Sequence, residues 1–169
     1  VSHPQVDAVG FVGSAATAEA IVRSAGLKRT LIEASGNGPQ IICDDADLDA
    51  AAAAAVFGAS FAGGQCCVAT ERLLVQESVH AEVVERILAH AAAVTLGDPR
   101  EEGITMGPLN NEAVAAKVDA HLADARAKGA RILTGGEREA GFPTDLYYPL
   151  TVIDDVTTDM LLFTDESFG

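Results

Sequence analysis

The sequence is poor in basic residues and in aromatic residues. Its 169 residues include 11 Lys and Arg against 25 Asp and Glu, a formal net charge of −14. A surface of that charge repels the phosphates of nucleic acids, so we expect no nucleic-acid partner. Tryptophan is absent and aromatic residues make up 5% of the chain. The core must therefore be built mainly from aliphatic side chains and alanine.

Long apolar runs and a cysteine framework are also missing. No apolar stretch approaches the roughly 20 residues of a membrane-spanning helix, so we expect no membrane partner. The three cysteines, two of them adjacent, do not make a disulfide framework. The four histidines lack cysteine or histidine partners at zinc spacing, so we expect no metal site. Free thiols fit a reducing compartment, and we expect a cytoplasmic protein.

Segments typical of strands alternate with segments typical of helices. We expect helices at 15–25, from about 50 toward 61, from Ser78 as N-cap to about 94, and from 110 or 111 to about 129. Strands are expected at 9–12, 28–33, 40–43, 72–76, 131–134 and 148–153. This alternation predicts an α/β protein with a mostly parallel sheet flanked by helices. Both ends of the sequence fall inside the pattern, so we expect a fragment.

The most informative motif is the pair Cys66–Cys67, which follows Gly63-Gly64-Gln65. Two glycines lower helix stability and indicate a tight backbone turn. Backbone N–H groups at such a turn can stabilise a thiolate or an oxyanion, which suits a nucleophile. The alternative is that both cysteines are small buried hydrophobic residues. We predict that one of them faces substrate and the other packs inward.

Glu33 is a candidate general base. It ends an apolar run and precedes the glycine-bearing segment Ser35–Pro39. Ligands of α/β proteins collect at the carboxyl ends of strands, and burial there would raise the pKa of a carboxyl toward the range of a base. A solvated glutamate at a strand end is the alternative. Gly10–Ser14 ends a strand and opens a helix, which is at most a weak sign of a phosphate site.

Several segments together resemble the NAD(P)-dependent aldehyde dehydrogenase superfamily. Phe11–Ser14 is similar to the family's Phe-Thr-Gly-Ser cofactor turn, and Leu31–Pro39 to its Leu-Glu-Leu-Gly-Gly-Lys-x-Pro segment. Ala62–Cys67 is similar to the family's Asn-x-Gly-Gln-x-Cys motif. Three further segments match in the right order, so the resemblance spans nearly the whole chain: Gly97–Pro99, Met106–Leu109 and Glu166–Gly169.

The resemblance implies a domain division, a reaction and a set of site residues. Residues 1–33 would be the C-terminal remnant of the NAD(P)-binding domain, and 34–169 the catalytic thiol domain, truncated at its C-terminus. Cys67 would be the nucleophile and Glu33 the general base. Cofactor contacts would come from Gly13, Ser14, Ala34, Glu166 and Phe168.

The implied reaction is the oxidation of a small-molecule aldehyde to a carboxylic acid. NAD or NADP would be the cofactor, and the path would run through a thiohemiacetal and a thioester on the cysteine. The resemblance also implies a homo-oligomer of the full-length protein. We expect residues 1–169 alone to be inactive.

Three alternatives stay open at this point. Ala62 stands where the family motif has asparagine, as in relatives that transfer the acyl group to coenzyme A, so a CoA-acylating semialdehyde dehydrogenase is one. Ala34, Ser35 and Asn37 replace the commoner Leu, Gly and Lys, and a non-catalytic scaffold module is the second. A thiol redox protein is the third and weakest, because the sequence lacks a C-x-x-C motif.

Overall fold

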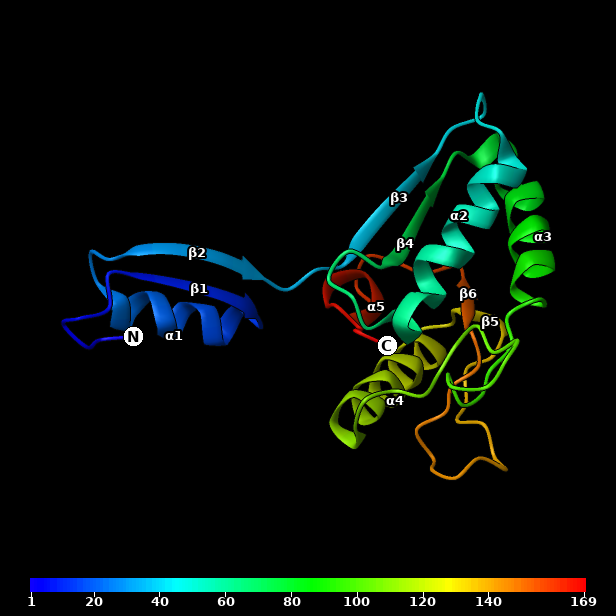
Figure 1. The fold of residues 1–169 in the computed structure, drawn as a ribbon. Coiled ribbons are helices and arrows are strands. Elements are labelled where there is room, and N and C mark those ends of the chain that lie inside the picture. Colours follow the sequence, from blue (N-terminus) through cyan, green and yellow to red (C-terminus); the bar gives the residue numbers. More distant parts are fainter. The chain divides into compact units, whose positions relative to one another are not determined.

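The computed structural model describes all of residues 1–169, which form two compact units, Val1–Gly36 and Asn37–Gly169 (Figure 1). The α/β class is confirmed, because helices alternate with strands that pair mostly in parallel. The strands form three separate two-stranded pairs rather than one sheet. The assignment of residues 1–33 to a cofactor domain and of 34–169 to a thiol domain stays a prediction.

The first unit is a single β–α–β element. Strands β1 (Ala8–Gly13) and β2 (Arg29–Ala34) pair in parallel along their whole length, and helix α1 (Ala15–Ala25) connects them. Ser14 caps α1 by accepting from Thr17 N, and Gly26 ends it with φ 65°. Only Ala18 and Ala25 are buried in this unit. It therefore has almost no core of its own.

The second unit begins with a parallel strand pair covered by two helices (Figure 1). Its elements are β3 (Gly38–Ile42), α2 (Leu48–Ser60), the 3₁₀ turn η1 (Phe61–Gly64), β4 (Thr70–Val75), the 3₁₀ turn η2 (Glu77–Val79) and α3 (His80–Ala91). The core between strands and helices consists of Ile42, Ala52, Val56, Val83 and Ile87. Asp47 caps α2 by accepting from Ala50 N, and Asp49 lies in the first turn, where a carboxylate favours the positive end of the helix.

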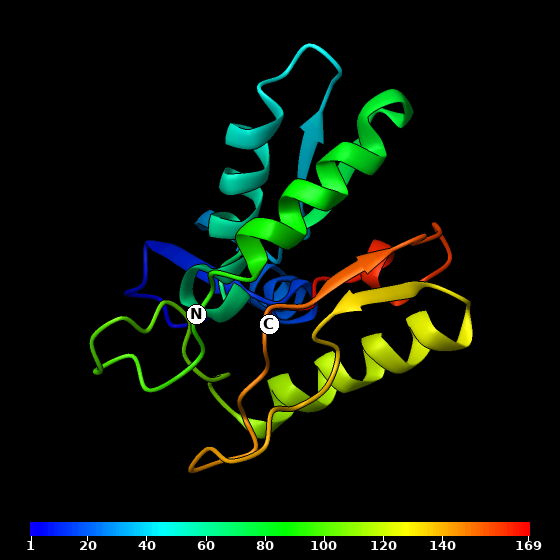
Figure 2. The same ribbon diagram turned by 90° about the vertical axis from the view of Figure 1, so that its right-hand side faces the viewer.

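The rest of the second unit is a helix packed on an antiparallel pair (Figure 2). Its elements are α4 (Glu112–Ala127), β5 (Arg131–Thr134), β6 (Val152–Asp154) and the short α5 (Leu161–Thr164). Asn111 caps α4 by accepting from Val114 N. Ile132 of β5 and Ile153 of β6 pack against a second core cluster, which consists of Leu109, Ala115, Val118, Leu122 and Tyr148. No helix in either unit is long and apolar enough to cross a membrane.

Three local predictions are corrected by the structure. Ser78 does not cap a helix: it lies inside η2, and α3 begins after Val79 without a side-chain cap. The strand expected at 148–153 is shorter and starts at Val152, because Pro149 has no N–H to donate and the Thr151 hydroxyl accepts instead from Gly136 N. Helix α5 was not predicted, since four residues are too few to show a helical period.

Candidate active site

The cysteines follow a turn built from left-handed backbone. Ala62, Gly63 and Gly64 have φ values of 52°, 64° and 77°. They follow Phe61, the C-cap of α2, whose ψ of 127° already leaves the helical path, and they form the turn that leads to the cysteines. Cys66 and Cys67 are both half-buried. Burial therefore does not distinguish the two cysteines, and the assignment of one to substrate and the other to packing stays a prediction.

Gln65 holds this turn against the segment before α4. Its side-chain Nε2 donates to Ala62 O at 2.9 Å, and its Oε1 accepts from Asn110 N at 2.7 Å. The backbone after it is fixed by Cys66 N donating to Gly64 O and by Ala69 N donating to Cys66 O, both at 2.9 Å. The cysteines therefore lie in a short loop whose two ends are hydrogen-bonded before β4 begins.

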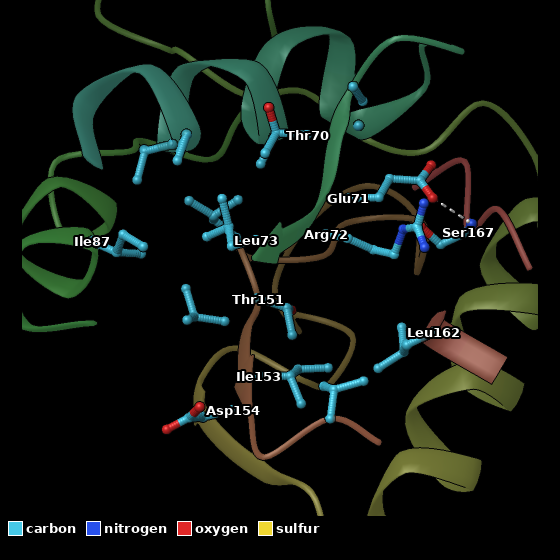
Figure 3. Close-up of a pocket in the computed structure, with 18 of the residues that line it drawn as sticks. Thr70, Glu71, Arg72, Leu73, Ile87, Thr151, Ile153, Asp154, Leu162 and Ser167 are labelled. Atoms are coloured by element: carbon cyan, nitrogen blue, oxygen red, sulfur yellow. Dashed lines mark hydrogen bonds between the residues drawn. The ribbon is translucent and has the colours of Figure 1, made fainter. Parts of the chain in front are cut away.

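The segment Glu166–Gly169 lies beside this turn. A Cβ built on Gly64 would come within 3.1 Å of the Gly169 carbonyl carbon, so a side chain there would require its neighbours to move by a few tenths of an ångström. The Glu71 carboxylate accepts from Ser167 N at 3.1 Å, shown in Figure 3, and from Phe168 N at 3.3 Å. The structure thus brings together Cys67 and two of the predicted cofactor contacts, Glu166 and Phe168, on adjoining segments.

The remaining predicted residues meet in the first unit, at the carboxyl edge of its strand pair. Val12 pairs with Glu33 and Gly13 with Ala34 in the strand register. Ser35 N donates to Gly13 O at 2.8 Å, which joins the two strand ends beyond the last pair. Ser14 lies at the same edge as the N-cap of α1. The placement of Glu33 relative to Cys67 stays a prediction, because the two residues belong to different units.

A cavity of about 770 Å³ opens inside the second unit (Figure 3). Most of its lining is apolar and comes from β3, β4, α4 and the region of β6. Gly63 and Gly64 before the cysteines line it, as does Glu71 after them, but neither cysteine is among the lining residues. The cavity therefore lies next to the cysteine turn rather than around the thiols.

His121 is the most buried ionisable group of this cavity. Its side chain is 3% exposed, and its Nδ1 has no hydrogen-bond partner. Burial lowers its pKa, and the charge of Lys117 acts in the same direction. No three His, Cys, Asp or Glu side chains gather closely enough to hold a metal ion. Burial thus favours the neutral form of the His121 imidazole, against the opposing charges of Asp165 and Asp124.

Sequence reasoning found the cysteine turn and both strand ends, but it missed the residues that hold the turn in place. The sequence motif includes Gln65 without indicating its hydrogen bonds, and it does not extend to Glu71. A glutamate within the apolar strand Thr70–Val75 was the available signal, because a carboxylate is rarely half-buried without a partner. Its partners are 96 and 97 residues away.

Comparison with known proteins agrees with these motifs. The chain is 40% identical over 170 residues to aminoaldehyde dehydrogenase 1, peroxisomal, of Pisum sativum, covering 99% of this chain and 34% of that protein. It is 38% identical over 171 residues to betaine aldehyde dehydrogenase, chloroplastic, of Atriplex hortensis, covering 100% of this chain and 34% of that protein. The chain thus spans about a third of the length of these relatives.

Solved structures agree in the same way. An E. coli NADP-dependent enzyme superposes with a TM-score of 0.95 at 34% identity, covering 99% of this chain and 35% of that chain. Betaine aldehyde dehydrogenase of Staphylococcus aureus, solved with NAD⁺, gives a TM-score of 0.91 at 32% identity, with 99% and 34% covered. A sequence model of the aldehyde dehydrogenase family matches residues 1–169. With its cysteine turn and its two glycine-bearing strand ends, the chain belongs to the aldehyde dehydrogenase family.

Proposed function

We propose that the complete protein containing this chain oxidises an aldehyde to a carboxylic acid with NAD or NADP, and that Cys67 is its nucleophile. The observation that carries the proposal is the turn Ala62–Gly64, whose left-handed backbone delivers Cys67 to a fixed loop beside Glu166–Gly169. Membership of the family supports the same reaction.

The chemistry at Cys67 proceeds in two stages. The thiolate sulfur attacks the aldehyde carbon, and the carbonyl oxygen takes up a proton to give a thiohemiacetal. Loss of hydride from that carbon, together with the hydroxyl proton, leaves a thioester. Water then attacks the thioester carbon, the C–S bond breaks, and the acid and the thiolate are released. The Cys67 sulfur is bonded to the substrate throughout, so its position fixes the reacting carbon.

Glu33 is the proposed base of the second stage. It is the penultimate residue of β2, directly before Ala34, at the strand edge that also carries Gly13 and Ser14. A carboxylate there takes the proton of the attacking water and later gives it up to solvent. Because Glu33 and Cys67 belong to different units, this role requires that the two units present both side chains to one substrate.

The first unit also has the residues to bind a nicotinamide dinucleotide. The N-terminus of α1 is capped by Ser14, and its first turn contains no acidic residue to neutralise the positive end of the helix. Such an end suits a pyrophosphate, and the helix follows directly from Gly13 at the strand edge. On the second unit, Glu166 and Phe168 would contact the nicotinamide side. When bound, the cofactor supplies the hydride acceptor.

The test compares two neighbouring thiols in the complete protein containing residues 1–169. Reduced nucleotide is measured by its absorbance with betaine aldehyde, aminoaldehydes and succinic semialdehyde, substrates chosen from the names of the relatives. We expect Cys67→Ser to lower kcat by about 10⁴ or more. The matched variant Cys66→Ser should keep most of the activity. Equal activity of the wild type and Cys67→Ser would exclude Cys67 as nucleophile.

A second arm identifies what takes up the acyl group. Each assay is repeated with coenzyme A, and the product is identified as free acid or as acyl-CoA. We expect free acid, since Glu33 is present to activate water. Acyl-CoA as the main product would assign the protein to the CoA-acylating alternative. If no aldehyde is oxidised and the cysteine thiols also prove unreactive, the scaffold alternative is favoured.

We also propose that the complete protein is a homo-oligomer in a reducing compartment, the cytoplasm. None of the three cysteines forms a disulfide, which supports the compartment. Large apolar side chains exposed on the second unit, among them Ile41, Phe57 and Val68, support further protein contacts. Light scattering of the purified protein and fractionation of cells test these two points.

A further inference from the structure

Glu71 joins the strand after the cysteines to the last segment of the chain. It is the second residue of β4 and lies four positions after Cys67. One carboxylate oxygen accepts from Ser167 N at 3.1 Å (Figure 3), and the other accepts from Phe168 N at 3.3 Å. Each oxygen therefore binds one of two consecutive backbone amides. Hydrogen bonds to an ionised acceptor are roughly twice as strong as neutral ones.

The segment that Glu71 binds needs such a restraint. Phe168 has φ 58°, a left-handed conformation that costs a non-glycine residue of order 1 kcal/mol. The next residue, Gly169, contacts Gly64 on the other side of the cysteine pair. The same segment is therefore held at Gly64, before the cysteines, and at Glu71, after them.

The surroundings of Glu71 leave its carboxylate dependent on the two backbone amides. Burial raises the pKa of its carboxyl, and the charge of Glu166 acts in the same direction, whereas the two amides and Lys117 lower it. The neighbouring Arg72 does not neutralise it, because its guanidinium donates to Asn37 O at 2.9 Å and lies over the Phe163 ring. The two backbone amides are thus what compensates a carboxylate at this depth.

We propose that Glu71 is a positioning residue: it fixes Glu166–Phe168 against the cysteine turn, so that the side chains that contact the cofactor are set relative to Cys67. The effect on cofactor binding rests on the proposed function, whereas the contact between Glu71 and the Ser167 and Phe168 amides does not. Glu71 touches neither substrate nor cofactor in this role. It affects how tightly the nucleotide binds through Glu166–Phe168. It does not affect the reactivity of the Cys67 thiol.

The experiment uses the complete protein with Glu71→Ala, which removes both acceptors, and Glu71→Gln, which keeps one carbonyl oxygen. Glu85→Ala, an exposed glutamate of α3, is the matched control. We expect the KM for the nucleotide to rise about tenfold in Glu71→Ala, the effect of losing roughly one net charge-assisted hydrogen bond, and to rise less in Glu71→Gln. The aldehyde KM and the rate of Cys67 alkylation by iodoacetamide should stay at wild-type values.

Hydrogen exchange of the peptide containing 166–169 tests the contact without any assay of activity. We expect faster exchange of the Ser167 and Phe168 amides in Glu71→Ala, an intermediate rate in Glu71→Gln and no change in Glu85→Ala. Unaltered exchange in Glu71→Ala overturns the proposal, whatever the activity of the wild type. If exchange is faster in Glu71→Ala but the wild-type protein never reduces NAD or NADP, Glu71 still restrains the segment and the proposed function is overturned instead. A fall in kcat accompanied by equal rises in the nucleotide and aldehyde KM values rules out a specific positioning role. So does an unchanged nucleotide KM in an active Glu71→Ala enzyme.

Discussion

The turn before Cys67 and the turn after Glu33 both use left-handed backbone, but they are supported very differently. The cysteine turn uses two glycines and is held by Gln65, and Glu71 adds hydrogen bonds to a distant segment. The turn after Glu33 places Ser35 at φ 69°, and its unit buries only two alanines. Cys67, the proposed nucleophile, thus follows a turn that is held within its own unit, whereas Glu33, the proposed base, lies in a unit with almost no core.

The largest expected effect compares the cores of the two units. Ile42 is 1% exposed and Leu31 is 81% exposed. We expect Ile42→Ala to lower the free energy of unfolding of the 169-residue chain by about 2–5 kcal/mol, because it leaves a cavity between β3 and the helices. Leu31→Ala should change it by less than about 0.5 kcal/mol. Urea denaturation measures both, and an equal loss would mean that the two units share one core.

The next effect isolates the crowding of the cysteine turn. Gly64 and Gly103 have similar φ values of 77° and 83°, but a Cβ meets the Gly169 carbonyl carbon at 3.1 Å in the first and nothing within 4 Å in the second. We expect Gly103→Ala to cost about 1 kcal/mol for the left-handed backbone alone, and Gly64→Ala about 2–3 kcal/mol. The midpoint of urea denaturation gives both. Equal costs would show that the Gly64–Gly169 contact yields without strain.

The smallest effect concerns the turn after Glu33. Ser35 adopts a left-handed conformation that is strained for serine and unstrained for glycine. We expect Ser35→Gly to raise the free energy of unfolding by at most about 1 kcal/mol, since the flexibility of glycine in the unfolded chain offsets part of the gain.

The matched substitution for Ser35→Gly is Ser24→Gly within α1. It should lower stability by up to about 0.5 kcal/mol, because glycine is a poorer helix former than serine in the last turn of α1. Thermal denaturation compares the two variants. Effects of the same sign would contradict the strain at Ser35.

The alternation of helices and strands was predictable because its signals are local. Ser14, Asp47 and Asn111 lie directly before apolar or alanine-rich runs, and each caps the helix that follows. The prediction at Ser78 was wrong, because the same residue type also suits a 3₁₀ turn. The strand expected at 148–153 begins only at Val152. The apolar residues around Pro149 suggested a strand, but proline lacks the N–H that strand pairing requires.

The sequence by itself determined where the chain turns and which side chains stand at those turns, because glycines, caps and strand-forming runs act over a few residues. Cys67 after two glycines and Glu33 at a strand end are of this kind. Only the tertiary structure decided what holds the turns. Gln65 reaches Asn110 across 45 positions and Glu71 reaches Ser167 across 96, and no local pattern encodes which backbone amide a distant carboxylate will meet. That pairing follows from the path of the folded chain, which depends on how the two core clusters pack.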